Sequence, residues 1–480
     1  MESLVLNHSS RDLQILIAES SGSAVLALLV RLLSNPSIWS DVHRPKSILH
    51  NIVSSVLEID QTVPNNDMKL PSDNVFYAMA GDRAGSFFLE ALLECCDLQL
   101  FVSVVTTAIC CEVEVEMGVE TSSSRVLEYA EDKAGNFVLQ AILRRIRSEL
   151  SSPIDENVKV REKVVEVAVK IMNELFSQEV MKSLCANRSG VVMRLLEVCE
   201  VLPIDKEEWG GKFGMAVINT WIGRGGDVTA EDLVPVVEAK FSCSNNDDDN
   251  KNNRSEKKKE DPSLSSDYDS SQLQSAKLFG LLLMSSSPEV SRLAAKTLSL
   301  LSLNTLKTVC TSGQLSKAIV DVFFEKYKGS NEFRALGVSL VSIGTDLGKH
   351  FVGQHVVRKS FESCDLRGRE KWAMTLSADL AGLSVNKEGR ASLQLVNAEL
   401  YSKDPTEWRT AAKKMIKAAN LLAELDNNNS NNNNNNTSIR FNKVTCLKVE
   451  AQKAGQMNVI DIFSRGEQLH QSNSQVEQTT

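Results

Sequence analysis

Two stretches of this chain repeat one pattern of glycine, polar and aromatic residues. Residues 80–94 read AGDRAGSFFLEALLE and residues 130–144 read AEDKAGNFVLQAILR. After the glycine come a small polar residue, a phenylalanine and, three positions later, a longer polar residue: Ser86, Phe87 and Glu90 in one copy, Asn136, Phe137 and Gln140 in the other. An aromatic ring between two hydrogen-bonding side chains can stack on a nucleobase and bond its edge. The repeated pattern therefore predicts a surface that binds bases.

The same spacing also has a purely structural explanation. At about 100° per residue, the three positions share one face of a helix, and the apolar residues between them share the opposite face. Phenylalanines packed between repeats, with polar neighbours that are merely solvated, would leave the same pattern. The matching placement in two copies, each directly after a glycine, keeps both interpretations open.

Such side chains need a regular scaffold, and the self-similarity indicates stacked repeats. Weaker copies of the pattern occur at residues 11–33, 187–199, 311–325, 352–364 and 387–400. Gly353 and Gly389 are 36 residues apart, which is the size of a two- or three-helix unit of the armadillo or HEAT class. We therefore expect an all-α fold of stacked helical repeats.

Composition agrees with a large helical protein. The 480 residues include 42% hydrophobic and only 5% aromatic residues, which suits a long stack of helices. The net charge of −9 weighs against a nucleic-acid partner, although it does not describe any single face. Ten cysteines without a CxxC motif predict reduced thiols in the cytosol or nucleus. No signal peptide or membrane-spanning run is expected.

Changes in composition divide the chain into four parts. We expect N-terminal repeats at 1–240, a disordered charged insertion at 241–271, C-terminal repeats at 272–425 and an Asn-rich disordered tail at 426–480. Three lysines in the insertion, Lys257 to Lys259, are either a nuclear import signal or an ordinary solvated charge run.

The pattern D-x-x-G-[NS]-[aromatic]-x-[VL]-[QE] resembles the Pumilio repeat. AEDKAGNFVLQAILRRI is the best match, and VGQHVVRKSFESC is another. The resemblance implies an α-solenoid whose repeats each offer a base-reading trio, with a third trio at Gln354, His355 and Arg358. By the code of that family, the trio with Asn136 and Gln140 favours uracil, and the trio with Ser86 and Glu90 favours guanine.

The other copies depart from that pattern. Val191 and Val192 replace the polar and aromatic positions in the copy at 187–199. The trios at 311–325 and 387–400 are incomplete: Gln314, Leu315, Ala318 and Arg390, Ala391, Gln394. Reading of a long base sequence, as in cytoplasmic Pumilio-type mRNA regulators, would need many intact trios, so we expect base reading by only a few repeats.

The order of three segments, AMAGDRAGSFFLEALLE, CDLRGREKW and DPTEWRTAAKK, resembles the nucleolar protein nine family of small-subunit ribosome biogenesis factors. The resemblance covers roughly residues 11–420. It implies a C-shaped solenoid of Pumilio-like repeats that binds pre-rRNA of the small subunit and acts in 18S rRNA processing. It also implies a monomer in the nucleus and nucleolus, pre-ribosomal protein partners, and neither enzymatic activity nor a cofactor.

Basic residues follow two of the trios. They are Arg144, Arg145 and Arg147 after the second, and Lys349, Arg358, Lys359, Arg367, Arg369 and Lys371 around the third. These side chains are expected to contact phosphates. The alternative is a solvated helix face for the first cluster and internal ion pairs for the second. The main alternative function is an armadillo/HEAT-like protein-interaction scaffold.

Catalytic and metal-binding patterns are missing from the sequence. His350 and His355 are five residues apart, which does not place them on one helix turn. The glycine-rich segments 210–212 and 223–226 lack the GK[ST] signature of a phosphate loop. We therefore assign no catalytic residue and no metal ligand.

Overall fold

The computed structural model describes residues 10–35, 52, 56–57, 75–109, 125–152, 158–241 and 270–430. Every regular element within these ranges is a helix, so the all-α prediction is confirmed for the described chain. The helices form two compact units whose boundary lies between Leu336 and Gly337.

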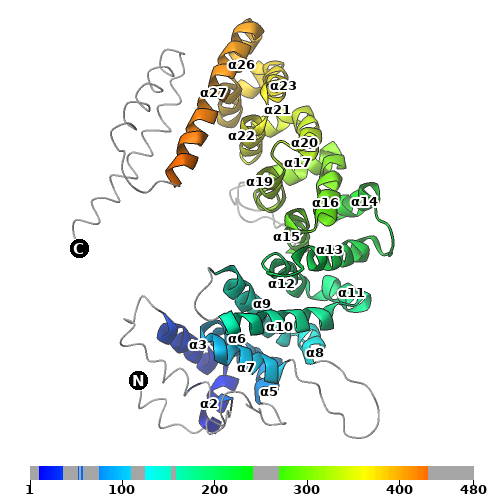
Figure 1. The fold of residues 1–480 in the computed structure, drawn as a ribbon. Coiled ribbons are helices and arrows are strands. Elements are labelled where there is room, and N and C mark those ends of the chain that lie inside the picture. Colours follow the sequence, from blue (N-terminus) through cyan, green and yellow to red (C-terminus); the bar gives the residue numbers. More distant parts are fainter. Residues whose placement is uncertain are drawn as a thin grey trace, which may run out of the picture. The chain divides into compact units, whose positions relative to one another are not determined.

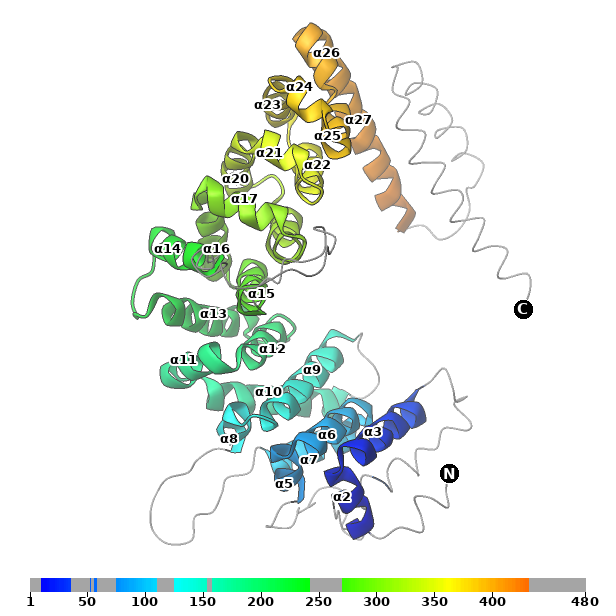
Figure 2. The same ribbon diagram turned by 180° about the vertical axis from the view of Figure 1, so that it is seen from behind.

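The first unit is built from groups of three helices (Figures 1 and 2). Its N-terminal helices are α2 (Ser10–Ala18), α3 (Ser20–Ser34), α5 (Val75–Gly81), α6 (Arg83–Cys95), α7 (Leu98–Ala108), α8 (Arg125–Glu131), α9 (Gly135–Ser151) and α10 (Val158–Leu175). They continue with α11 (Gln178–Asn187), α12 (Ser189–Cys199), α13 (Lys206–Ile222), α14 (Ala230–Phe241), α15 (Ser270–Met284), α16 (Pro288–Leu300), α17 (Leu303–Thr311), α18 (Gly313–Leu315), the π-helical turn η2 (Ser316–Asp321) and α19 (Val322–Tyr327). Helix α20 (Asn331–Ser342) contains the boundary.

The second helices of successive groups pack against one another. Helix α3 contacts α6, α6 contacts α9, α9 contacts α12, and α12 contacts α15, which packs on η2 and α19. We call this series the second-helix row. Figure 2 shows α3, α6 and α9 following one another along the chain. This stacking of similar units is the α-solenoid that the repeats predict.

The core lies between the second-helix row and the helices around it. In α6, Phe88, Leu89 and Leu92 have no exposed surface, and in α9 Val138 and Leu139 are equally buried. Full burial of such side chains contributes about 1.5–3 kcal/mol each. Since each second helix is covered by neighbours on both sides, its apolar positions extend over most of its circumference.

The charged insertion lies within the first unit rather than between the two units. Helix α14 ends at Phe241 and α15 begins at Ser270, and the Phe241 and Phe279 rings meet edge to face at 6.1 Å. The predicted division of the repeats at 241–271 stays a prediction, and the boundary between the two compact units lies between Leu336 and Gly337. Almost all of the predicted insertion, 241–271, lies outside the described residues, as does most of the predicted tail, 426–480.

The second unit contains the remaining helices. They are α21 (Gly344–Lys349), α22 (Gly353–Ser363), α23 (Leu366–Ser377), α24 (Leu380–Ser384), α25 (Lys387–Val396), α26 (Ala398–Lys403) and α27 (Pro405–Ser430). Helix α22 packs on α25, so the second unit also pairs the helices that carry the repeated pattern.

Two buried tryptophans hold the second unit together. Trp372, in the CDLRGREKW segment, donates a hydrogen bond from Nε1 to Ser360 Oγ at 3.1 Å. Trp408, in the DPTEWRTAAKK segment, donates from Nε1 to the Val396 carbonyl at 2.7 Å. Each ring buries a large apolar area while its single N–H keeps a partner, as buried tryptophans require. These two segments therefore have a packing function in the fold.

Within the described ranges, no single helix is both long and apolar enough to span a membrane. Only α2 and α3 taken together reach the required length and composition, and they are bent by 111°. Helix α3 buries Leu26, Ala27 and Val30 in its contact with the rest of the unit.

Candidate nucleic-acid interface

The D-x-x-G part of the repeated pattern is a helix N-cap. Asp82 Oδ2 accepts a hydrogen bond from the Gly85 N–H at 2.7 Å, and Asp132 Oδ1 accepts one from the Gly135 N–H at 2.7 Å. The first N–H groups of a helix have no partner within it, and an aspartate side chain supplies one. The cap determines where α6 and α9 begin. It thereby determines which later side chains face outwards.

Other residue types take this role in the second unit. Asn386 Oδ1 accepts from the Gly389 N–H at 2.7 Å, and His350 Nδ1 accepts from the Gly353 N–H at 3.4 Å. The four caps precede the glycine by three residues in each case. A motif search that requires aspartate would therefore miss the two caps in the second unit.

In two copies of the pattern a close backbone contact requires the glycine, whereas at Gly135 the nearest atom to an added Cβ is a Tyr129 side-chain carbon at 3.1 Å. A Cβ atom on Gly85 would lie 2.4 Å from the Met79 carbonyl oxygen, and one on Gly353 would lie 2.5 Å from the Leu347 oxygen. In both copies the carbonyl belongs to the residue six positions earlier, near the end of the preceding short helix. Any larger residue would push the first and second helices of the repeat apart.

The two phenylalanines of the trios are exposed. Phe87 on α6 has 42% of its surface accessible and Phe137 on α9 has 49%. The two helices are neighbours in the second-helix row, so both rings come from adjacent repeats. This arrangement differs from the core-packing interpretation, in which the rings would be buried.

The small polar residues of the trios are buried, contrary to the expectation of an open polar face. Ser86 is 4% exposed and donates from Oγ to the Arg83 carbonyl at 3.1 Å. Asn136 is 5% exposed and donates from Nδ2 to the carbonyls of Asp132 and Lys133. Both residues directly follow the capped glycine, where the short first helix covers the chain. Their donor groups therefore bond backbone carbonyls at the start of the helix.

The longer polar residues are half-buried beside the rings. Gln140 donates from Nε2 to Asn136 Oδ1 at 3.0 Å, which joins the two polar positions of the second trio. Glu90 accepts from Arg144 Nη2 at 3.2 Å. Burial raises the pKa of the Glu90 carboxyl above its ordinary value, and the ion pair with Arg144 opposes this shift without cancelling it.

The arginines that follow the second trio are engaged within the protein. Arg144 also pairs with Glu94 at 3.0 Å, and Glu94 in turn pairs with Arg31 at 3.5 Å. We call Arg31, Glu94, Arg144 and Glu90 the charge ladder, since the pairs run from α3 through α6 to α9. Arg31 and Glu94 are not among the residues predicted from the sequence. The signal is positional, because Arg31, Glu94 and Arg144 each lie nine residues after the glycine of their repeat.

The other two arginines are paired in the same way. Arg147 pairs with Glu197 of α12 at 3.2 Å, and Arg145 pairs with Glu149 at 2.8 Å. The alternatives predicted for this cluster are phosphate contacts or a solvated helix face, and in the structure its arginines form ion pairs within the protein.

The degenerate copies present different side chains. Val191 and Val192 are fully buried, so the copy at 187–199 has no exposed trio. In the copy at 311–325, Ser312 Oγ accepts from the Leu315 N–H at 3.3 Å. Leu315 thus takes the place of the glycine, and Lys317, two residues later, is the exposed residue. The alignment on Gly313, which put Leu315 at the ring position, is wrong by two residues.

The third predicted trio lies on α22 in the second unit. Gln354 is half-buried and donates from Nε2 to the Phe351 carbonyl at 3.2 Å. His355 is exposed, and its ring meets the Phe351 ring edge to face at 6.0 Å. Arg358, one turn later, is exposed too. Phe351 is 67% exposed and was not among the predicted residues.

The basic cluster around this trio divides into inward and outward side chains. Arg369 is only 9% exposed and donates to the carbonyls of Glu362 and Cys364. Lys349 pairs with Asp379 at 2.6 Å. Arg358, itself a member of the trio, is an exposed cation of this cluster.

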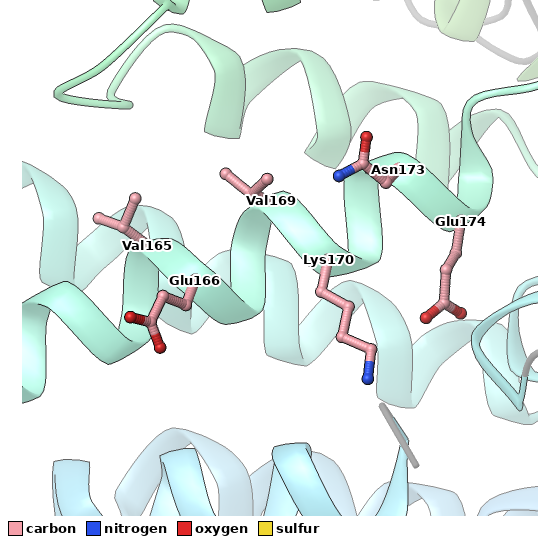
Figure 3. Close-up of a pocket in the computed structure, with 6 residues that line it drawn as sticks. All are labelled: Val165, Glu166, Val169, Lys170, Asn173 and Glu174. Atoms are coloured by element: carbon pink, nitrogen blue, oxygen red, sulfur yellow. The ribbon is translucent and has the colours of Figure 1, made fainter. Parts of the chain in front are cut away.

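One cavity in the described part of the chain has no trio residue in its lining. It is a shallow depression of about 420 Å³ along α10, a third helix of its group. Figure 3 shows its lining residues, which all belong to that helix: Val165, Glu166, Val169, Lys170, Asn173 and Glu174. The candidate site is therefore a surface across neighbouring helices and not a small-molecule pocket.

Removing the cap of α9 should loosen the second trio. Asp132→Ala removes a carboxylate that two backbone N–H groups bond, which should destabilise the start of α9 by about 0.5–2 kcal/mol. Hydrogen exchange of the first turn of α9 measures this loss, with Lys133→Ala, an exposed neighbour, as the control. Equal protection in the two variants would contradict the role of the cap.

The effect of this cap should depend on pH. Although burial acts to raise the pKa of Asp132, the hydrogen bonds from Gly135 and Ala134 outweigh it and hold the pKa below the ordinary 3.8. The cap therefore contributes its full stability above pH 3.8, and this contribution is lost as the pH falls through the lower pKa of the folded protein. The difference in stability between Asp132→Ala and the wild type should therefore shrink as the pH falls below 3.8.

Comparisons with known proteins agree with the stacked-repeat fold described above. The sequence profile of the NOP9-like PUF repeat domain matches residues 1–391. Three solved structures of APUM23, with GGAGUUGACGG, GGAUUUGACGG and GGAAUUGACGG, share 17% identity with this chain, with TM-scores of 0.56, 0.56 and 0.55. They cover 85%, 84% and 84% of this chain.

The chain spans 65% of the first APUM23 chain and 64% of the other two. A comparison with curated proteins found no match. The structural likeness at this low identity supports the solenoid fold, and the profile match extends over most of the sequence. This chain belongs to the family of proteins with a NOP9-like PUF repeat domain.

Proposed function

We propose that this protein binds single-stranded segments of RNA across α6 and α9. The observation that carries the proposal is the pair of exposed rings, Phe87 and Phe137, on helices that pack side by side. Glu90 and Gln140 lie one turn after the rings and can bond the edges of bases stacked there. Family membership and the solved structures of APUM23 with RNA sequences such as GGAGUUGACGG support this choice of ligand.

We further propose that the RNA is small-subunit pre-rRNA and that the protein acts without catalysis in ribosome biogenesis. Support comes from the NOP9-like domain and from the small number of exposed trios. A few base contacts select a site poorly in a long unstructured RNA. They suffice where a folded RNA and pre-ribosomal proteins present one segment. This role places the protein in the nucleus and nucleolus.

Crosslinking of the full chain to RNA in cells, followed by sequencing, tests the identity of the RNA. The expected result is enrichment of one region of the small-subunit precursor. Enrichment of messenger RNA instead would replace this proposal with a role as a Pumilio-type mRNA regulator. Loss of the crosslinks on replacing both rings would locate the contact on α6 and α9.

The charge ladder favours one competing function. Because its arginines are neutralised by glutamates, this part of the second-helix row has less attraction for phosphate than its arginine content suggests. A protein-interaction scaffold would have such a balanced surface. Binding of a structured pre-rRNA fragment at physiological salt separates the two functions, since a scaffold should retain none of it.

A further inference from the structure

The pairing of Arg144 joins two neighbouring trios. Arg144 belongs to α9, one turn beyond Gln140 of the second trio, yet its guanidinium bonds Glu90 of the first trio on α6 at 3.2 Å. The side chain of Glu90 is 21% exposed and that of Arg144 is 32% exposed. An ion pair at this depth is screened less by solvent than one on the open surface.

We propose that Arg144 is a positioning residue for Glu90, so that the choice of base at the first trio depends on the next repeat. This inference rests on the proposed RNA binding and adds a specificity determinant to it. Glu94 accepts a hydrogen bond from the same Arg144 nitrogen, Nη2, at 3.0 Å, so this nitrogen is held by both carboxylates. Arg144, itself held by Glu94, thereby restrains the orientation of the Glu90 carboxylate, one turn after Phe87 on α6.

The chemistry of the bases explains why the orientation and ionisation of the Glu90 carboxylate affect the choice of base. The edge of guanine offers two neighbouring N–H donors, and an ionised carboxylate is a pure acceptor that matches them. Uracil offers one donor between two acceptors, so it fits a group that both donates and accepts, such as a glutamine or a protonated glutamic acid. An oxygen that already accepts from Arg144 has a further lone pair for the base.

Arg144 is needed because burial alone works against the ionised form of Glu90. Burial raises the pKa of this carboxyl, and Arg144 is the largest opposing influence. Without Arg144, more of Glu90 would carry a proton at a given pH. The carboxyl would then also accept uracil, and its preference for guanine would fall as the pH is lowered.

The test uses the full chain and two RNA probes, a uridine oligomer with one central guanine and the same oligomer without it. The readout is the ratio of the two affinities, at pH 8 and at pH 6. Arg144→Gln should reduce the preference for the guanine probe by about tenfold or more, as expected when a hydrogen bond to a charged group is lost. The reduction should be larger at pH 6. Arg147→Gln is the matched control, because Arg147 pairs with Glu197 and not with Glu90.

Glu90→Gln completes a double-mutant cycle with Arg144→Gln. It should abolish the guanine preference, and Arg144→Gln added to it should cause no further change in the ratio. A guanine preference that survives Arg144→Gln at both pH values would overturn the positioning role. The same holds if Glu90→Gln leaves the ratio unchanged. If the wild-type chain binds neither probe nor pre-rRNA, the proposed function itself fails, which is a separate outcome.

Discussion

Replacing Phe87 and Phe137 together with alanine should weaken RNA binding by about two orders of magnitude or more. Stacking of a base on an aromatic side chain contributes about 1–3 kcal/mol per base, and the double variant removes two such contacts. Because the rings are 42% and 49% exposed, their loss opens little space in the core. Fluorescence anisotropy with a pre-rRNA fragment measures the affinity, and circular dichroism should show unchanged helix content.

A matched control for this pair is Phe176→Ala. Phe176 is 38% exposed but lies between α10 and α11, outside the second-helix row, with its ring against Phe213 at 5.4 Å. This control should keep the wild-type RNA affinity. If the double variant also keeps it, the rings are not the binding surface and the proposed function loses its main support.

One contact of the Phe87 ring affects how much RNA affinity its replacement should remove. The Arg31 guanidinium lies over the Phe87 ring, 5.6 Å from its centre. A base that stacks on Phe87 must displace Arg31 or share the ring with it, whereas Phe137 has no such cation among the described residues. We therefore expect Phe137→Ala alone to account for more of the loss than Phe87→Ala alone.

Substituting alanine for Gly85 should destabilise the first unit by about 1–3 kcal/mol, the usual cost of forcing extra atoms into a packed site. The added Cβ would lie 2.4 Å from the Met79 carbonyl oxygen, a distance at which backbone must move. The free energy of unfolding from urea titration should fall, and hydrogen exchange should locate the change at α5 and α6.

Gly81 provides the control for this substitution. It is the last residue of α5, and a Cβ placed there meets no atom within 4 Å. Gly81→Ala should leave stability unchanged or raise it slightly, because alanine favours helix more than glycine does. Equal stability of the two variants would show that α5 can shift without cost and that the pattern does not require glycine.

The sequence predicts most of the scaffold because it depends on local rules. The repeated glycine, the capping residue three positions before it and the apolar positions of α6 and α9 all follow helix periodicity, which can be read along the chain. The alignment at 311–325 failed because Ser312 caps Leu315 there, and no glycine marks the start of that turn. A cap can be supplied by several residue types, so the register is ambiguous until its hydrogen bonds are known.

The site is less predictable because it depends on contacts between repeats. Ser86 and Asn136 have helical spacing that suits an exposed face, yet the preceding short helix buries them. Likewise, nothing near Arg144 in the sequence indicates that its partners are Glu90 and Glu94, some 50 residues earlier. Only the stacking of α6 on α9 brings these charges together.

The charge ladder also determines how strongly salt and other polyanions should compete with RNA for this surface. A surface whose arginines already have carboxylate partners releases few counterions when RNA binds, so its affinity should change little with salt. Unrelated polyanions, which attract most RNA-binding proteins through their phosphates, would then gain little on α6 and α9. With the RNA binding proposed above, such a surface would select its partner by contacts to bases rather than by attraction to phosphates.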